Sequence, residues 1–337
     1  MLKNILTITL LFVLSCANLP YWDRVEIVLD KNFPQWIRLA DKFSDQTSGI
    51  CFLGAEGNSK TFLIVDDVGS MHRIKYTNDK LKEFTTYKFS EKVTKYLSKF
   101  PKKDFEEISF DSSTGEVYLS IEGNLPDFRK STKIVKVKFK NNSIFSNMIE
   151  DFEELNITPA ETFEKYLDNN VAYEGMTVDK NYIYLGLEGF QSGVFFADST
   201  YIYVVDKKTL KIIKEISTKQ YKIGTICGLQ NHNGDLWGVD RNGFNVFRMR
   251  LNEKMDVVDI QKFDFKSRIP GTEDLSYISA IESITFDNEN NIYLVDDPWK
   301  RFYIPGESVL SKLPEETVKN FKSYIPIIYK YNLINQN

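Results

Sequence analysis

Short runs of alternating hydrophobic and polar residues recur along this chain about 50 to 70 residues apart, the spacing typical of propeller blades. Three runs follow one pattern: glutamate, any residue, Ile or Met, Ser or Thr, Phe or Val, and a closing aspartate. Two looser runs fit the same register without the acid. The five runs begin at Ser48, Glu106, Glu174, Cys227 and Glu282. The pattern therefore predicts five β repeats, each opening with an inner strand.

Each inner strand is followed by a second apolar run, and Gly/Asn/Asp-rich turns between the two are typical of hairpins. Second strands are expected at residues 62–67, 117–122, 183–188, 236–240 and 292–297. Third strands are expected at residues 71–76, 133–138, 201–206, 246–251 and 327–331. Fourth strands are expected at residues 84–89, 143–148, 210–216 and 257–265. Each repeat is thus an antiparallel blade, and the last one lacks its fourth strand.

A short apolar segment at residues 25–29 has no partner nearby in sequence. Pairing it with the last blade closes the ring and leaves no open sheet edge. We therefore predict an all-β, five-bladed propeller, with a six-bladed ring as the alternative, in one domain spanning residues 17–337. Short helices are expected at residues 90–98, 158–167 and 314–322, between or late in blades.

The first sixteen residues are typical of a targeting segment, because Lys3 precedes an apolar run that is too short to span a bilayer. Ser15-Cys16 directly after that run resembles the lipobox of bacterial lipoproteins, in which the cysteine is lipidated and becomes the mature N-terminus. An ordinary signal peptide is the alternative. The lipobox predicts a location in the bacterial cell envelope, with a lipid anchor at Cys16 on the periplasmic or extracellular side. We expect the protein to be a monomer.

Composition excludes one class of partner. The 337 residues carry 43 basic and 47 acidic side chains, a net charge of -4, so there is no basic face of the kind that nucleic acid needs. The two remaining cysteines, Cys51 and Cys227, fall in non-adjacent repeats, and we expect both to be buried and reduced.

Acidic residues gather at one end of the predicted channel, since the start of a first strand lies beside the end of the second. The second strands end in acids as well: Asp66, Asp67, Glu122, Glu188, Asp240, Asp296 and Asp297. Three carboxylates about 5 Å apart repel by roughly 10 kcal/mol in total at an effective dielectric near 20. Such a cluster must take up protons or hold a cation.

Oxygen ligands without a His or Cys cluster favour Ca²⁺. The predicted metal site is the column Ser48, Glu106, Glu174, Cys227 and Glu282. The alternative is that these glutamates cap strand ends separately. His72 and His232 belong to no Ser-His-Asp arrangement, so hydrolysis here would depend on a metal-polarised phosphoryl group.

Candidate residues for this hydrolysis are chosen by their predicted positions near the end of the channel. Asp66, Asp67, Glu188, Asp296 and Asp297 are the predicted catalytic acids that position water. Arg73, Arg241, Lys300 and Arg301 are the predicted phosphate-binding cations, with solvated surface charge as the alternative.

At these residues the chain resembles two propeller families. Four stretches resemble the phytase-like "esterase-like activity of phytase" family. They are Ser48-Gly49-Ile50, Val65-Asp66-Asp67 with Arg73, Glu106 with its strand, and Glu174-Gly175-Met176 with Leu187-Glu188-Gly189. The column also resembles that of the calcium-activated nucleotidases (apyrases), whose five blades hold a central Ca²⁺ with Ser, Glu, Glu, Ser, Glu; Cys227 departs from it. The likeness implies Ca²⁺ and a small phosphorylated or ester substrate.

Two hypotheses follow. In the first, the chain is a Ca²⁺-dependent phosphohydrolase or esterase. In the second, it is a non-catalytic cell-envelope propeller whose Ca²⁺ is structural and whose face binds a glycan, peptide or protein. The contact candidates for the second are the aromatic residues Trp22, Phe190, Phe195 and Trp299.

Overall fold

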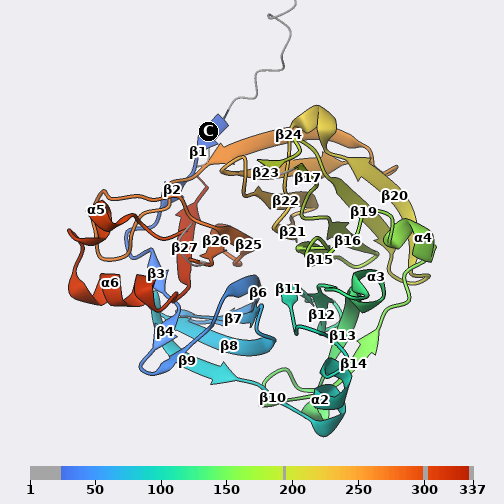
Figure 1. Cartoon of the computed structure of the whole chain (residues 1–337), viewed down its shortest axis with the longest axis horizontal. Helices are drawn as coiled ribbons and strands as arrows, with labels where there is room; N and C mark the ends of the chain where they lie inside the picture. The colour runs from blue at the N-terminus through green and yellow to red at the C-terminus, as the bar shows by residue number, and fades with distance from the viewer. Residues whose placement is uncertain (1–23, 193–194, 299–302, 334–337) are drawn as a thin grey trace, which may run out of the picture.

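Five antiparallel sheets surround a central axis in the computed structural model, which describes residues 24–192, 195–298 and 303–333 (Figure 1). The five-bladed propeller expected from the sequence is confirmed. In every blade the first strand faces the axis and packs against the first strands of both neighbouring blades. These inner strands are β6 (Thr47–Glu56), β11 (Phe105–Asp111), β15 (Gly175–Val178), β21 (Gly228–His232) and β25 (Ile281–Phe286).

Four blades then run outward in sequence order, and the last blade takes its outer strand from the N-terminus. The second strands are β7 (Ser59–Asp66), β12 (Glu116–Ile121), β16 (Tyr182–Gly186), β22 (Asp235–Asp240) and β26 (Asn291–Asp296). The third strands are β8 (Ser70–Thr77), β13 (Lys133–Phe139), β19 (Tyr201–Asp206), β23 (Asn245–Leu251) and β27 (Ile327–Asn332). The outer strands are β9 (Lys80–Thr86), β14 (Met148–Glu154), β20 (Lys211–Ser217), β24 (Val257–Asp264) and, in the last blade, β2 (Val28–Leu29).

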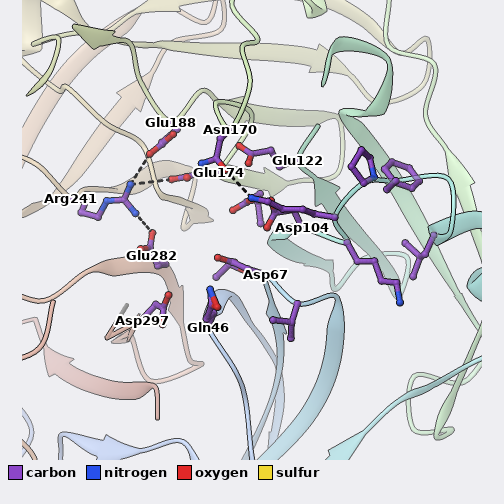
Figure 2. Close-up of a pocket in the computed structure, with 18 of the residues that line it drawn as sticks. Gln46, Asp67, Asp104, Glu122, Asn170, Glu174, Glu188, Arg241, Glu282 and Asp297 are labelled. Carbon is purple, nitrogen blue, oxygen red and sulfur yellow. Dashed lines mark hydrogen bonds and ion pairs between the residues drawn. The ribbon is translucent and has the colours of Figure 1, made fainter. Parts of the chain in front are cut away.

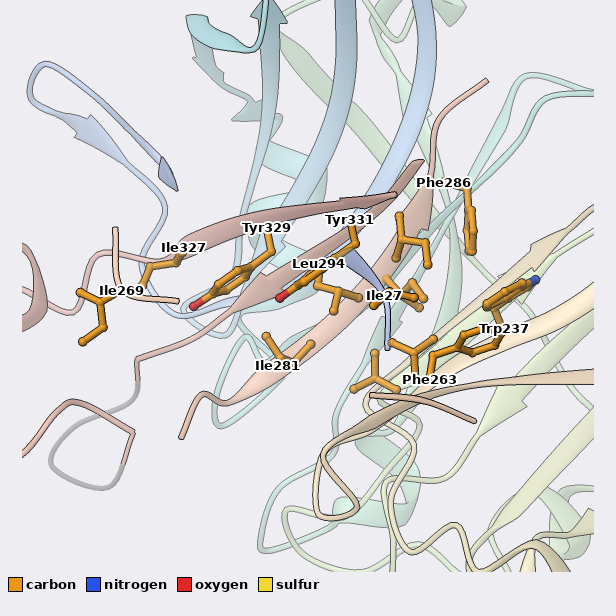
Figure 3. Close-up of a cluster of buried hydrophobic side chains, with 14 of the residues drawn as sticks. Ile27, Trp237, Phe263, Ile269, Ile281, Phe286, Leu294, Ile327, Tyr329 and Tyr331 are labelled. Atoms are coloured by element: carbon orange, nitrogen blue, oxygen red, sulfur yellow. The ribbon is translucent and has the colours of Figure 1, made fainter. Parts of the chain in front are cut away.

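The N-terminal segment closes the ring by joining two blades rather than one. Strand β1 (Arg24–Glu26) pairs in parallel with β24 of blade four, whereas β2 pairs antiparallel with β27 of blade five. Between them Ile27 is buried against Phe263 of one blade and Leu294 of the other (Figure 3). The expected closure is therefore confirmed for β2, and the predicted single strand is corrected to two because the Ile27 side chain fills the seam between the blades.

One predicted strand is displaced. The fourth strand of blade two was expected at residues 143–148, but β14 begins only at Met148. Two of its acids, Asp151 and Glu153, lie opposite Lys138 and Lys136 of β13, and Lys138 forms a diagonal ion pair with Glu153, 2.6 Å apart. Charge pairing on this face of the two strands stabilises a segment too polar to be recognised by hydrophobicity.

The recurring inner-strand pattern has a structural explanation. Its Ser or Thr hydroxyls connect neighbouring blades: Ser109 accepts from the Val178 backbone N–H (3.2 Å) and Thr177 from that of Asn231 (2.9 Å). Its closing aspartates accept backbone N–H groups two residues later, as Asp287 does from Glu289 (2.8 Å), and so form the hairpin turn. The repeat therefore encodes both the contact between blades and the turn within a blade.

Most helices lie at the outer edge of the ring, whereas α3 lies inside the rim beside β12 and β13 (Figure 1). The helices expected near residues 90 and 314 are present, but the one expected over residues 158–167 is a single turn that begins only after Thr158, whose backbone pairs with Leu210 and Ile212 of blade three. The helices are α2 (Glu91–Leu97), α3 (Phe128–Ser131), α4 (Ala160–Phe163), α5 (Glu307–Leu310) and α6 (Glu315–Lys322). Within the described ranges, no helix is both long and apolar enough to cross a membrane.

The remaining short strands lie outside the regular positions of the blades. Strand β3 also pairs with β27, and β10 continues from blade one onto the outer strand of blade two. These strands are β3 (Gln35–Trp36), β4 (Arg38–Leu39), β5 (Lys42–Phe43), β10 (Lys88–Phe89), β17 (Gln191–Ser192) and β18 (Phe195–Phe196).

Candidate cation-binding site at the channel mouth

A cavity of about 830 Å³ opens where the inner strands begin (Figure 2). Its cationic lining residues, among those the structure describes, are Arg241, Lys102 and Lys103. Its carboxylates outnumber them: Asp67, Asp104, Glu106, Glu122, Glu174, Glu188, Glu282 and Asp297. The crowding of acids expected at this end of the channel is therefore present.

One backbone hydrogen bond, repeated in four blades, brings these acids together. In these four blades a residue one or two positions after the second strand donates its N–H to the carbonyl two residues before the first-column position. The pairs are Asp67 to Gln46 (3.0 Å), Glu122 to Asp104 (2.8 Å), Glu188 to Ala172 (2.9 Å) and Asp297 to Ala280 (3.0 Å). These four acids form a second column, and Arg241 holds the same place after the second strand of blade four.

β-Bulges direct the first column into the cavity. The pairing of β6 with β7 shifts register around Ser48, that of β11 with β12 around Glu106, and that of β25 with β26 around Glu282. A bulge turns a side chain away from the regular alternation of a strand. It accounts for acids that face the channel at positions directly followed by buried residues.

The cavity has two unlike halves. In the first, which we call the arginine half, Arg241 reaches three carboxylates (Figure 2). Its Nη2 lies 2.7 Å from Glu188 Oε1 and 3.8 Å from Glu174 Oε2, and its Nη1 donates to Glu282. The Cys227 thiol lies beside them, within 4.8 Å of carboxylate oxygens of Glu174 and Glu282. This half contains its own counter-ion.

The second, arginine-free half consists of Asp67, Asp104, Glu106 and Glu122. Ligand oxygens of the first three lie within 4.8 Å of one another. The described cation that pairs with this half is Lys102, whose Nζ is 3.4 Å from Asp104 and whose side chain is 56% exposed. In addition, Glu122 Oε1 and Asn124 Oδ1 are buried without a hydrogen-bond partner. Buried oxygens of this kind usually bind a donor, water or an ion.

Burial raises the pKa of carboxylates in both halves, including that of Glu174 beside Arg241, and the halves differ in whether a fixed cation opposes the shift. Burial first, then the charges of Glu122 and Asp67, raise the pKa of Glu106 well above its ordinary value. Burial, then Asp297 and Asp104, do the same to the pKa of Asp67. Burial also raises the pKa of Glu188, but there Arg241 acts in the opposite direction. The arginine-free half therefore holds carboxylates that resist ionisation without a cation.

A further buried acid, Glu107, lies beneath the mouth. Its carboxylate accepts hydrogen bonds from the Ser283 hydroxyl (2.8 Å) in blade five, which itself accepts from the Ile50 N–H (3.1 Å) in blade one. Blades two and five are not adjacent, so this side chain crosses the axial region. Glycines at the equivalent positions of three blades leave room there; a Cβ at Gly228 would come 2.7 Å from Ser283 Cα. Glu107 thus connects the inner strands below the cavity.

The predicted catalytic acids divide into two groups. Asp67, Glu188 and Asp297 line the cavity, whereas Asp66 and Asp296 do not. Asp66 accepts from the Ser70 N–H (2.7 Å) and meets His72 Nε2 at 3.0 Å, and Asp296 accepts from the Tyr277 hydroxyl. In these two blades the aspartate that ends the second strand therefore forms local hydrogen bonds, whereas the next residue faces the channel.

The first-column members Ser48, Glu106, Glu174 and Glu282 line the cavity, and Cys227 lies beside it. The hydroxyl of Ser48 is already used, since it donates to the carbonyl of Phe105. Both Cys51 and Cys227 are buried free thiols. The column is thus brought together, but as parts of two different halves rather than as one ligand ring.

The predicted phosphate-binding cations do not gather. Arg73, expected near the mouth, lies on the third strand of blade one, where its Nη1 donates to the carbonyls of Ile144 (2.9 Å) and Ser146 (3.2 Å). Third strands are remote from the axis, which corrects that placement. Arg241 is at the mouth but pairs with carboxylates. Lys300 and Arg301 lie outside the described residues.

The aromatic residues predicted as contacts for a partner, and the predicted lipidation site, are located as follows. Phe190 packs edge-on against Tyr166 and Tyr201, at 5.3 and 5.8 Å between ring centroids, so it is largely a packing residue. Cys16, Trp22, Trp299 and the side chain of Phe195 lie outside what the structure describes.

Several lining residues were not assigned to the site from the sequence. Gln46 and Asp104 precede the first column by two residues, and Lys102, Lys103 and Asn170 come from loops. The signal for Asp104 was present in the repeat, as an acid two positions before Glu106. The loop residues had no such signal, because only the folded chain brings them to the mouth.

Fold and site together define the class: a five-bladed β-propeller with an acidic mouth where, among the described residues, one largely buried arginine meets the carboxylates. No family model and no curated protein matches the chain.

Solved structures with a similar course of the chain include the PQQ-bound aldose sugar dehydrogenase of Streptomyces coelicolor, at 9% identity and a TM-score of 0.41, covering 89% of this chain and 98% of that one. The soluble aldose sugar dehydrogenase of Escherichia coli in its apo form has 9% identity and a TM-score of 0.43, with 89% and 99% covered. A streptogramin B lyase has 9% identity and a TM-score of 0.36, with 89% and 98% covered. Similarity this low is no guide to activity, so function must be inferred from the site.

Proposed function

We propose that this protein is a Ca²⁺-binding propeller whose ion is held in the arginine-free half of the mouth. The observation that supports this most is the excess of buried carboxylate there, with Glu122 Oε1 and Asn124 Oδ1 left without a partner. Arg241 already compensates part of the negative charge of the other half, so the need for a cation is greater here.

The donor set fits calcium. Asp67, Asp104 and Glu106 would hold the ion directly, and Glu122 and Asn124 supply further oxygens close by. Ca²⁺ takes six to eight oxygen ligands in flexible geometry, whereas Mg²⁺ demands a tight octahedron and Zn²⁺ prefers nitrogen and sulfur. This proposal keeps Glu106 of the predicted column as a ligand and transfers Glu174 and Glu282 to the arginine.

The first experiment is metal content and thermal stability of the purified protein. After dialysis against trace calcium, we expect about one Ca²⁺ per chain and a melting temperature that falls when EGTA is added. Mg²⁺ at the same concentration should restore little of the lost stability. Absence of bound Ca²⁺, together with a melting temperature insensitive to EGTA, would contradict the proposal.

A second candidate function is the Ca²⁺-dependent hydrolysis of phosphate esters. The observation that favours it is a set of phosphate-compatible donors beside the acid cluster: Lys102 and Lys103 at the cavity wall, with Lys102 Nζ 3.1 Å from Asn170 Oδ1. A bound Ca²⁺ would supply charge for polarising a phosphoryl oxygen. Asp297 and Glu188 are then candidates for holding water near the substrate.

Phosphate release from nucleotides, phytate and aryl phosphates, together with the cleavage of aryl esters, measured with Ca²⁺ and with EGTA, tests this candidate. Turnover that needs Ca²⁺ supports it. If no substrate turns over in Ca²⁺ while the ion still raises the melting temperature, the non-catalytic binding propeller is the function that remains.

The lipobox also leads to a proposal about location. We propose that Cys16 is lipidated and holds the propeller at the cell envelope. Metabolic labelling with a radioactive fatty acid should mark the full chain but not its Cys16→Ser variant. Equal labelling of both would contradict it.

A further inference from the structure

We propose that Arg241 is a built-in counter-ion: its guanidinium occupies what would otherwise be a second divalent-cation site and thereby limits the mouth to one ion. The number of one bound ion per wild-type chain rests on the proposed function. The role of Arg241 itself depends only on the contacts of the arginine half.

The first reason is what the guanidinium touches. It meets Glu188 at 2.7 Å, Glu174 at 3.8 Å and the carboxylate of Glu282, so it joins blades three, four and five. A divalent cation held by three converging carboxylates would make the same connections. Arginine does so with a fixed fork of donors and a charge that does not titrate in the physiological range.

The second reason is where the arginine comes from. The four other blades present an acid at the second-column position, whereas blade four presents Arg241. Blade four also lacks the first-column acid and has Cys227 there. Thus the same backbone positions that supply acid elsewhere supply the cation here, and it is delivered next to the acids of both flanking blades.

The third reason is that the site has ligand capacity which the guanidinium does not fully use. Glu188 Oε2 is buried without a hydrogen-bond partner in a residue only 4% exposed, and Glu174 Oε2 makes no hydrogen bond, only the 3.8 Å ion pair with Arg241. Glu174, Cys227 and Glu282 offer ligand atoms within 4.8 Å of one another. Removing the arginine would therefore leave a cluster of converging oxygens ready for a cation.

The test counts ions. Equilibrium dialysis with ⁴⁵Ca²⁺ should give about one ion per chain for the wild-type protein and about two for Arg241→Gln. Arg241→Lys, which keeps the charge, should remain at about one. Arg248→Gln is the matched control, because Arg248 pairs with Asp259 at 2.9 Å on the outer part of the same blade; it too should remain at one.

The possible results separate the two proposals. No ion in the wild type but one in Arg241→Gln would refute the proposed function and support the role of Arg241. One ion in both would refute the role of Arg241 and leave the proposed function intact. If Arg241→Gln unfolds in EGTA, refolding on addition of Ca²⁺ with two bound ions supports the inference. Failure to refold in Ca²⁺ contradicts it, since an ion should then replace the guanidinium.

Discussion

The two halves of the channel mouth place similar acids on similar strands but compensate their charge differently. In the arginine half, Glu174, Glu188 and Glu282 converge on Arg241, a cation fixed by the chain. In the arginine-free half, Asp67, Asp104 and Glu106 converge, and the ion pair that the described residues make with them comes from the exposed Lys102. The difference teaches that a repeated acidic column does not define one ion site, because a single substitution in one blade changes what its neighbours need.

The largest effect should come from removing the fixed cation. Arg241→Gln leaves buried carboxylates unpaired, and breaking a buried ion pair from one side costs about 3 to 5 kcal/mol. We expect that loss in the free energy of urea unfolding measured in EGTA. Arg248→Gln, at a partly exposed pair, should cost less than about 1 kcal/mol. Equal losses in the two variants would mean that the arginine half has no special need of charge.

The next effect separates the halves directly. Binding at about one hundred times the dissociation constant stabilises a protein by about 2.7 kcal/mol, so Ca²⁺ should raise the melting temperature by several degrees. Glu106→Gln should abolish that rise, whereas Glu282→Gln, the matched change in the arginine half, should retain it. If differential scanning fluorimetry shows that Glu282→Gln abolishes the rise and Glu106→Gln retains it, the ion binds in the arginine half instead.

A third effect is the pH dependence of the chelated protein. Because the pKa values of Asp67, Glu106 and Glu122 are raised by burial and mutual repulsion, the folded state holds protons that the unfolded state has lost. Stability in EGTA should therefore fall as pH rises above the ordinary carboxyl values of 3.8 and 4.5. Ca²⁺ should flatten this slope. Groups with raised pKa values ionise roughly between pH 5 and pH 8. If the stability of the chelated protein rises steadily over that interval, the raised pKa values of these carboxyls are contradicted.

The smallest effect concerns Lys102. Its Nζ lies 3.4 Å from Asp104, so Lys102→Gln removes a weak competitor for the proposed ion. Exposed pairs are worth about 0.2 to 1 kcal/mol, and the affinity for Ca²⁺ should rise by about 1.5- to 5-fold in isothermal titration. Lys92→Gln, at an exposed pair with Asp151, is the control and should change nothing. Weaker binding in Lys102→Gln would mean that the lysine helps to build the site.

How much the sequence could predict depended on whether a residue belonged to the repeat. The inner strands, the blade number and the channel-facing first column follow from spacing and alternation. The choice between Asp66 and Asp67, or Asp296 and Asp297, did not, because a one-residue difference at a strand end decides whether a side chain serves its turn or the channel. The partners of Arg241 come from blades far apart in sequence, and no local sequence pattern predicts such an ion pair.

The central claim is that the free cation site lies in the arginine-free half. The most direct measurement is an anomalous difference map from crystals grown with CaCl₂. We predict one peak bounded by Asp67, Asp104 and Glu106, with Arg241 still paired with Glu188. A peak among Glu174, Glu188 and Glu282 with the arginine displaced, or no peak in either half, would contradict it.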